Sequence, residues 1–258
     1  MTSLDTDERG PSFDAVKRRP EISWWRDAQA DPDPRLVSLL RPDSFEADQY
    51  RTLRYGVERA CPTDGCRVLA ITSPIAGDGK TLTAINLAGA IAKAGQLRVL
   101  LLDTDLRRPA VAQMLGRKGR GDPGLVDAIL EPVQTLEKTI WRLDPFNLSV
   151  VTTRRVEADT YDLLASSRLG ELISDARQHY DYVLLDSPPV LPAPDCRLLA
   201  EWIDGFLIVV AADKTPRKLL EETLLSLGPT KILGLIFNGE SYRHSRYGKY
   251  YYAYYGRR

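Results

Sequence analysis

The amino-acid sequence predicts an α/β protein with a doubly wound, mostly parallel sheet. Two observations support this fold class. Short apolar runs typical of buried strands alternate along the chain with segments of helical periodicity. Acidic or polar residues follow several of these runs directly, as expected where parallel strands end at a ligand-binding edge. With 258 residues, 43% of them hydrophobic, the chain is long enough to bury a sizeable core.

The N-terminal residues 1–42 are rich in Asp, Arg, Pro and Ser, and their prolines interrupt any long helix. We predict a flexible lead-in there, with at most a short helix at residues 36–40. A helical pattern follows at residues 45–59. Three charged residues spaced by three lie near one face of this helix, and spacing alone fits a solvated surface. They are Asp48, Arg51 and Arg54.

The strongest local pattern joins an expected strand at residues 68–71 to an expected helix at residues 82–91. Glycines in the joining loop let backbone N–H groups face an anion, and the N-terminus of the helix adds its positive end. A lysine there reaches the outer phosphates of a nucleotide, and a threonine hydroxyl binds the accompanying Mg²⁺. The predicted nucleotide-binding residues of the loop are Gly77, Asp78, Gly79, Lys80, Thr81 and Leu82.

The loop departs from the usual Gly-x-x-x-x-Gly-Lys-[Ser/Thr] pattern, because Pro74 stands where that pattern has its first glycine. A glycine-rich turn without a ligand is therefore the alternative. The register of Gly79, Lys80 and Thr81 between a strand and a helix favours phosphate binding.

Carboxylates follow two further expected strands. The strand at residues 98–102 ends in Asp103 and Asp105, and the strand at residues 182–185 ends in Asp186. Either one member of the first pair continues the strand face while the other enters the loop, or both lie at the strand tip. An acid at this position in phosphate-loop proteins holds Mg²⁺ directly or through water, so the sequence predicts a magnesium site here.

The remaining elements complete the alternation of strands and helices. We expect them at residues 110–115, 125–130, 148–152, 168–179, 205–212, 218–227 and 231–237. Asn238 ends the last expected strand. It either contacts adenine, as the corresponding asparagine does in related ATPases, or starts a turn with Gly239. The central domain is expected to span residues 43–238.

Composition excludes several classes of function. Lys and Arg balance Asp and Glu at 35 each, so nothing indicates a bulk nucleic-acid binder, and a local basic patch is the alternative left open. No run approaches the roughly 20 apolar residues of a membrane helix, and the N-terminus does not resemble a signal peptide. We expect a cytoplasmic protein. Its three cysteines have neither the spacing nor the histidine partners of a zinc site or a disulfide framework.

The last eighteen residues hold seven of the twelve tyrosines, together with five Lys or Arg residues. This predicted tail, residues 239–258, is not a core segment. A disordered aromatic tail, an RNA-contacting arm with bases stacked on tyrosines, and a self-association segment all fit its composition. Its tyrosines are Tyr242, Tyr247, Tyr250, Tyr251, Tyr252, Tyr254 and Tyr255.

Together these motifs resemble the bacterial tyrosine kinases of capsule and exopolysaccharide synthesis, which are built on a phosphate-loop NTPase fold. Members of that family have a glycine-rich loop like residues 73–81 and three apolar residues followed by Asp-x-Asp-x-Arg, like residues 100–107. They also have a third motif like residues 183–189 and a C-terminal tyrosine cluster. Their upstream Glu-x-x-Arg-x-x-Arg helix corresponds to Asp48, Arg51 and Arg54, with aspartate in place of glutamate.

The resemblance implies an ATP-dependent tyrosine kinase that phosphorylates its own tail tyrosines. Lys80 and the loop N–H groups would hold the phosphates, and Thr81, Asp105 and Asp186 would bind Mg²⁺. Asp103 would accept the phenolic proton, although the roles of Asp103 and Asp105 are interchangeable at this point.

The resemblance also implies partners. The Asp48, Arg51 and Arg54 helix would mediate a homo-oligomer, in some members a ring, in which subunits exchange tails. A transmembrane polysaccharide chain-length regulator would activate the kinase and recruit it to the inner face of the membrane. Two alternatives are a positioning or partitioning ATPase with nucleotide-driven dimerisation, and a non-catalytic ATP-binding scaffold. Against the first, Ile75 stands where those ATPases typically have a second lysine.

Overall fold

The computed structural model describes residues 30–61, 67–95, 97–117, 122–144, 146–157, 160–193, 195–228 and 231–239. These residues form a seven-stranded sheet in the order β3-β4-β2-β5-β1-β6-β7. All neighbouring strands are parallel except β3 and β4, which are antiparallel. The predicted doubly wound, mostly parallel sheet is therefore confirmed, and the parallel strands end at one common edge.

The strands are β1 (Arg67–Thr72), β2 (Val99–Asp103), β3 (Trp141–Leu143), β4 (Leu148–Val151), β5 (Tyr182–Asp186), β6 (Gly205–Ala211) and β7 (Ile232–Asn238). The helices are α1 (Val37–Leu40), α2 (Phe45–Ala60), α3 (Lys80–Ala92), α4 (Val111–Met114), α5 (Leu125–Leu130), α6 (Thr160–Leu164), α7 (Ser167–His179), α8 (Asp195–Leu198) and α9 (Arg217–Leu227). Short 3-10 helices lie at η2 (Leu136–Thr139) and η3 (Leu199–Glu201).

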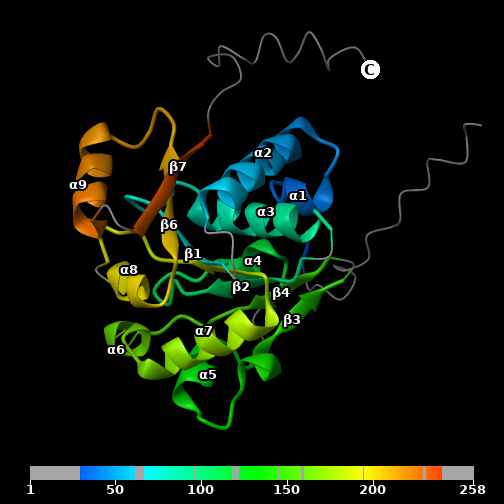
Figure 1. The fold of residues 1–258 in the computed structure, drawn as a ribbon, viewed down its shortest axis with the longest axis vertical. Coiled ribbons are helices and arrows are strands. Elements are labelled where there is room, and N and C mark those ends of the chain that lie inside the picture. Colours follow the sequence, from blue (N-terminus) through cyan, green and yellow to red (C-terminus); the bar gives the residue numbers. More distant parts are fainter. Residues whose placement is uncertain are drawn as a thin grey trace, which may run out of the picture.

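Alternation of side chains along each strand produces two hydrophobic layers. On β1, Leu69 and Ile71 belong to one core cluster, and Val68 and Ala70 belong to the other. Helices α1 to α4 cover the first face, and α5 to α9 pack against the second (Figure 1). Both faces of the central strands are buried, which explains their continuous apolar runs.

The short helix expected at residues 36–40 is confirmed as α1, but this end of the predicted lead-in is packed on the domain rather than flexible. Helix α1 is packed, with Leu36 and Leu39 fully buried against α3. The close approach requires Gly89 of α3, because a Cβ there would lie 2.8 Å from a methyl carbon of Leu39. Asn86 of α3 accepts a hydrogen bond from the backbone N–H of Ser38 at 2.9 Å. The packed domain therefore includes α1, whereas residues 1–29 lie outside the described part of the chain.

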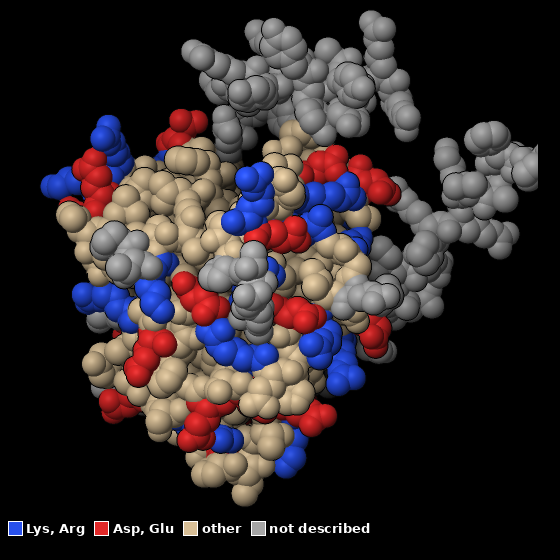
Figure 2. Space-filling view, in the orientation of Figure 1, with Lys and Arg blue, Asp and Glu red and all other residues tan. Residues whose placement is uncertain are grey.

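Other differences from the sequence prediction are local. Strand β3 was not predicted, because three residues are too few to show a period, and α6 and α8 were missed for the same reason. Helix α3 begins at Lys80 rather than at residue 82. Lys and Arg side chains are interspersed with Asp and Glu on the face shown in Figure 2. No helix in the described ranges has both the length and the apolar content needed to cross a bilayer.

Candidate active site

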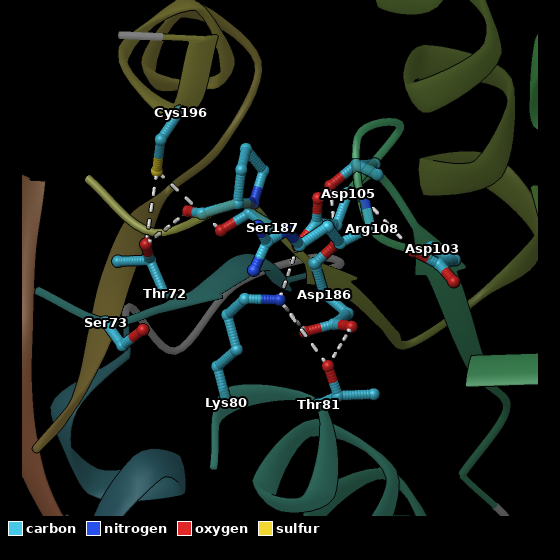
Figure 3. Close-up of polar contacts among 12 residues, drawn as sticks. Thr72, Ser73, Lys80, Thr81, Asp103, Asp105, Arg108, Asp186, Ser187 and Cys196 are labelled. Atoms are coloured by element: carbon cyan, nitrogen blue, oxygen red, sulfur yellow. Dashed lines mark hydrogen bonds and ion pairs between the residues drawn. The ribbon is translucent and has the colours of Figure 1, made fainter. Parts of the chain in front are cut away.

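The C-terminal ends of β1, β2 and β5 form the floor of the site. Asp186 at the end of β5 lies in register with Ile71 of β1 on one side and Asp103 of β2 on the other. The glycine-rich loop after β1 and the acidic segment after β2 therefore meet around Asp186 (Figure 3). The sheet places Ile71 next to Asp186, although the two residues are 115 positions apart in the sequence.

The loop between β1 and α3 has the backbone of a phosphate-binding loop. Gly77 and Gly79 adopt φ angles of +90° and +95°, which L side chains rarely adopt. The loop leads directly into α3, whose first residue is Lys80, so the N-terminus of a 13-residue helix faces the site.

Asn238 closes on this loop from β7. Its side-chain amide donates a hydrogen bond to the Asp78 carbonyl at 2.9 Å. The same amide nitrogen lies 1.9 Å from where a Cβ of residue 79 would be, so only glycine fits there. Gly239 follows with a φ of +76°. Asn238 thus supports the phosphate loop, a role the sequence analysis did not foresee, and an adenine contact stays a prediction.

Asp78 anchors the loop from its buried side chain. Its carboxylate accepts hydrogen bonds from the Thr215 hydroxyl at 2.8 Å and from the Ile75 N–H at 3.3 Å. Thr215 lies between β6 and α9, and no motif in the sequence distinguishes it. The carboxylate of Asp78 therefore holds the loop in place.

Lys80, Thr81, Asp105 and Asp186 form one polar centre. The Lys80 ammonium lies 2.7 Å from Asp105 Oδ2 and 3.7 Å from Asp186 Oδ1. The Thr81 hydroxyl donates a hydrogen bond to Asp186 Oδ2 at 2.7 Å. Burial alone would lower the pKa of Lys80, but the negative charges of Asp186 and Asp105 outweigh it and raise that pKa. Lys80 is therefore a charged ammonium held between carboxylates.

The two aspartates after β2 have different positions. Asp105 lines the cavity, whereas Asp103 is fully buried beneath it and is not among the cavity-lining residues. The Asp103 carboxylate accepts hydrogen bonds from the backbone N–H groups of Asp105 at 3.2 Å and Val111 at 3.1 Å. Burial and the charge of Asp186 raise the pKa of Asp103 well above its usual range. Burial also raises the pKa of Asp186, opposed by Lys80.

The cavity above these residues has a volume of about 1180 Å³. The predicted residues Gly77, Gly79, Lys80, Thr81, Leu82, Asp105 and Asn238 line it. This is large for a single small-molecule pocket, which usually has roughly 300–1,000 Å³. The cavity can therefore accept a nucleoside triphosphate and leave space beyond it.

The donor set fits Mg²⁺. Asp186 Oδ1 is buried and has no hydrogen-bond partner within the described structure. It lies beside the Thr81 hydroxyl and Asp105, and hard oxygen donors of this kind are the ligands that Mg²⁺ prefers. No group of three or more His, Cys, Asp or Glu side chains among the described residues could hold a metal alone. A metal here would therefore also need oxygens from phosphate or water.

A second ion-pair network, not predicted from the sequence, borders the cavity. Arg107 donates to both oxygens of Asp195, at 2.7 Å through Nε and at 3.2 Å through Nη2. The Thr160 hydroxyl donates to Asp195 Oδ2 at 2.7 Å. Asp195 is only 1% exposed, and Arg107 lines the cavity. The Asp-x-Asp-x-Arg motif contains Arg107, but the sequence did not indicate its partner, because Asp195 is 88 positions away.

The remaining predicted site residues do not meet this centre. Asp48 and Arg51 form an ion pair with each other on α2, and Arg51 also donates to the Pro42 carbonyl at 2.6 Å. Arg54 lies 3.6 Å from Glu58 on the same helix. These contacts are within one chain and leave the predicted oligomer contact untested. The seven tail tyrosines lie outside the described residues.

Comparison with known proteins matches residues 66–214 to the AAA domain family. Tyrosine-protein kinase YwqD of Bacillus subtilis (strain 168) is 32% identical over 218 residues, which cover 83% of this chain and 90% of YwqD. Succinoglycan biosynthesis transport protein ExoP of Rhizobium meliloti (strain 1021) is 32% identical over 260 residues. They cover 93% of this chain but only 32% of ExoP, so the chain spans about a third of that relative.

Solved structures share the fold. The kinase domain of Escherichia coli tyrosine kinase ETK has a TM-score of 0.76 at 24% identity, covering 88% of this chain and 90% of that domain. The septum site-determining protein MinD of Pyrococcus horikoshii OT3, complexed with Mg-ADP, is more distant. Its TM-score is 0.56 at 23% identity, and the match covers 68% of this chain and 72% of MinD. The described chain therefore has the fold of phosphate-loop nucleotide-binding proteins.

Proposed function

The chain belongs to the family of bacterial tyrosine-protein kinases, and we propose that it transfers the γ-phosphoryl group of ATP to tyrosines of its own C-terminal tail. The observation that supports this most is the convergence of Lys80, Thr81 and Asp105, which line one cavity, with the buried Asp186. The name of ExoP supports a role in exopolysaccharide or capsule synthesis.

The residues suit a triphosphate. N–H groups of the loop at residues 77–81 and of the α3 N-terminus would donate hydrogen bonds to its phosphate oxygens. Lys80 would exchange its contact with Asp105 for the β- and γ-phosphates. Thr81, Asp105 and Asp186 would hold Mg²⁺, which neutralises charge on the phosphate oxygens when bound. Binding therefore replaces a carboxylate–ammonium pair by a phosphate–ammonium pair, without leaving the buried lysine unpaired.

The transfer needs an acceptor for the phenolic proton, because a tyrosine hydroxyl has a pKa of about 10. The tyrosine oxygen forms a bond to the γ-phosphorus, the bond from that phosphorus to the departing ADP oxygen breaks, and the proton passes to a carboxylate. By family resemblance Asp103 is this base. Asp105 is the alternative, since it is the carboxylate that lines the cavity.

The test is incubation of the purified chain with γ-labelled ATP and Mg²⁺, followed by blotting for phosphotyrosine. We expect labelled tyrosine in the wild-type chain and none in Lys80→Met. Nucleotide hydrolysis with dimerisation but without phosphotyrosine would identify a positioning-type ATPase. ATP binding with neither hydrolysis nor phosphotyrosine would identify a scaffold. Either result would reject the kinase proposal.

We further propose that the tail of one subunit enters the site of a neighbour in a homo-oligomer formed through Asp48, Arg51 and Arg54. Mixing Lys80→Met with a chain whose seven tail tyrosines are changed to Phe tests the exchange, since neither can phosphorylate itself. Phosphate on the Lys80→Met chain is expected. Arg51→Gln in both chains should reduce it, whereas Arg59→Gln, a control on the same helix, should not. Absence of phosphate in the mixture would refute exchange.

The activating partner is proposed to be a transmembrane polysaccharide chain-length regulator that recruits the chain to the inner face of the membrane. A cytoplasmic kinase that depends on such a regulator should be stimulated by the regulator's cytoplasmic segment. Co-expression with and without the regulator, followed by membrane fractionation, tests recruitment. Equal distribution of the kinase in both samples would contradict it.

A further inference from the structure

We propose that the outer part of the cavity, at Arg107 and Arg108, binds the phosphate of a tail tyrosine that has already been modified. This inference rests on the proposed kinase function and names a second subsite beside the reacting centre. Its ligand is a phosphotyrosine side chain, which combines an aromatic ring with a dianion. Occupancy of this subsite would keep the next tyrosine of the same tail near the site.

Arg107 is built into the wall of the cavity. Asp195, which is almost completely buried, holds its guanidinium by two hydrogen bonds at 2.7 and 3.2 Å, and Thr160 fixes that carboxylate. The Arg107 side chain is nevertheless 51% exposed. A planar guanidinium held on one edge by a carboxylate is preorganised to offer N–H groups to a second oxyanion. The buried acid therefore positions the arginine.

Arg108 adds a second cation to the lining of the same cavity. Its backbone N–H donates to Asp105 Oδ1 at 3.0 Å, which places it next to the reacting centre (Figure 3). Its guanidinium makes no hydrogen bond or ion pair to any residue that the structure describes, and it lines the cavity. The two arginines that line the cavity match the two charges of a phosphate monoester.

Apolar residues also line the cavity, among them Met114, Pro188, Pro189 and Leu191. An apolar wall beside arginines suits a phosphorylated aromatic ring better than it suits inorganic phosphate or an aliphatic phosphate. The volume of about 1180 Å³ leaves space for this ring beyond a nucleotide.

The spacing of the tail tyrosines fits such a subsite. Arg107 follows Asp105 by two residues, so their Cα atoms are at most about 7 Å apart. An extended chain advances about 3.3 Å per residue, and tyrosines two residues apart, such as Tyr250 and Tyr252, are separated by a similar distance. One phosphotyrosine can therefore occupy the arginine wall while a second tyrosine of the same tail approaches Asp105.

The test measures peptide binding without turnover. The protein is the full chain with its seven tail tyrosines changed to Phe, saturated with ADP and Mg²⁺. The probe is a fluorescent peptide of residues 247–258 with phosphotyrosine at position 252, compared with the unmodified peptide by anisotropy. We expect the phosphopeptide to bind at least about tenfold more tightly, as charge-assisted contacts to two arginines imply. Equal affinities would overturn the proposal.

Matched substitutions locate the subsite. Arg107→Gln and Arg108→Gln should each weaken the phosphopeptide at least about threefold and leave the unmodified peptide unchanged. Arg98→Gln is the control, because Arg98 forms a similar two-point pair with Asp181 at the opposite end of β2. The Arg108→Gln variant also controls for misfolding, because the Arg108 side chain makes no hydrogen bond or ion pair to any described residue. If neither Arg107→Gln nor Arg108→Gln weakens binding of the phosphopeptide, the assignment is refuted.

The nucleotide distinguishes this subsite from the phosphate loop. If the phosphopeptide binds the chain without nucleotide but not the chain saturated with ADP and Mg²⁺, the phosphate lies in the nucleotide site and the inference is wrong. The kinase assay on the unmodified chain is independent of this measurement. A chain that phosphorylates its tail but shows no phosphopeptide preference rejects the second subsite alone, whereas a chain without phosphotransfer rejects the proposed function.

Discussion

Replacement of Lys80 by methionine should reduce stability in a strongly pH-dependent way. The ammonium lies 2.7 Å from Asp105 and 3.7 Å from Asp186, and its side chain is 10% exposed. Removing it leaves negative charges buried at the strand ends without a counter-charge. Breaking a buried ion pair by removing one partner typically costs about 3–5 kcal/mol. For a domain of this size that corresponds to roughly 6–20 °C in melting temperature.

The sign of the pH dependence follows from the aspartates. Asp103 and Asp186 have pKa values raised in the folded state, by burial first, so the folded chain binds protons more tightly than the unfolded chain. Stability therefore falls as pH rises from the unfolded pKa, about 3.9, through the folded values. Without Lys80 both pKa values rise further, so the fall continues to higher pH. The deficit of the variant should be largest near pH 8 and should narrow towards pH 5.

The assay is thermal unfolding of both proteins between about pH 5 and pH 8 at constant ionic strength. Lys214→Met is the matched control. Lys214 is exposed, and its ammonium contacts only the neutral Gly77 carbonyl, at 3.4 Å, among the contacts described for it. Its loss should cost no more than about 0.5 kcal/mol at any of these pH values. Parallel melting curves for wild type and Lys80→Met across the range would refute the reasoning.

Three further predictions concern individual positions. Gly79→Ala should abolish ATP binding in a titration, because its Cβ would lie 1.9 Å from the Asn238 amide at a φ of +95°, whereas Gly234→Ala, with no atom within 4 Å, should bind normally. Asp103→Asn should lower phosphotransfer at least about 100-fold if Asp103 is the base, with little change in melting temperature; retained activity would move that role to Asp105. Burial raises the pKa of Cys196 to about 11, so its thiol should resist alkylation at pH 8 until the chain unfolds, and rapid modification of the folded chain would contradict this.

The features that sequence predicted well are those repeated along the chain or local to one segment. Alternation of apolar runs and helical periods predicts the sheet, because buried parallel strands need apolar residues on both faces. The loop before Lys80 was predicted because its glycines, lysine and threonine are adjacent. The acids at the ends of β2 and β5 were predicted because they follow those strands directly.

The features that sequence missed depend on contacts between distant residues. The packing of α1 depends on the close approach that Gly89 permits, whereas its own sequence is short and flanked by prolines. Arg107 and Asp195 are 88 positions apart, and Asn238 and Asp78 are 160 apart. The difference between Asp103 and Asp105 depends on which one the loop backbone surrounds. No spacing rule contains that information.

The most direct test of the central claim is a crystal structure of the chain with Mg²⁺ and a non-hydrolysable ATP analogue. The account predicts that Lys80 leaves Asp105 and contacts the β- and γ-phosphates, with the metal bound beside Thr81 and Asp186. A nucleotide bound elsewhere, or a Lys80 ammonium still paired with Asp105 while the triphosphate occupies the cavity, would contradict it.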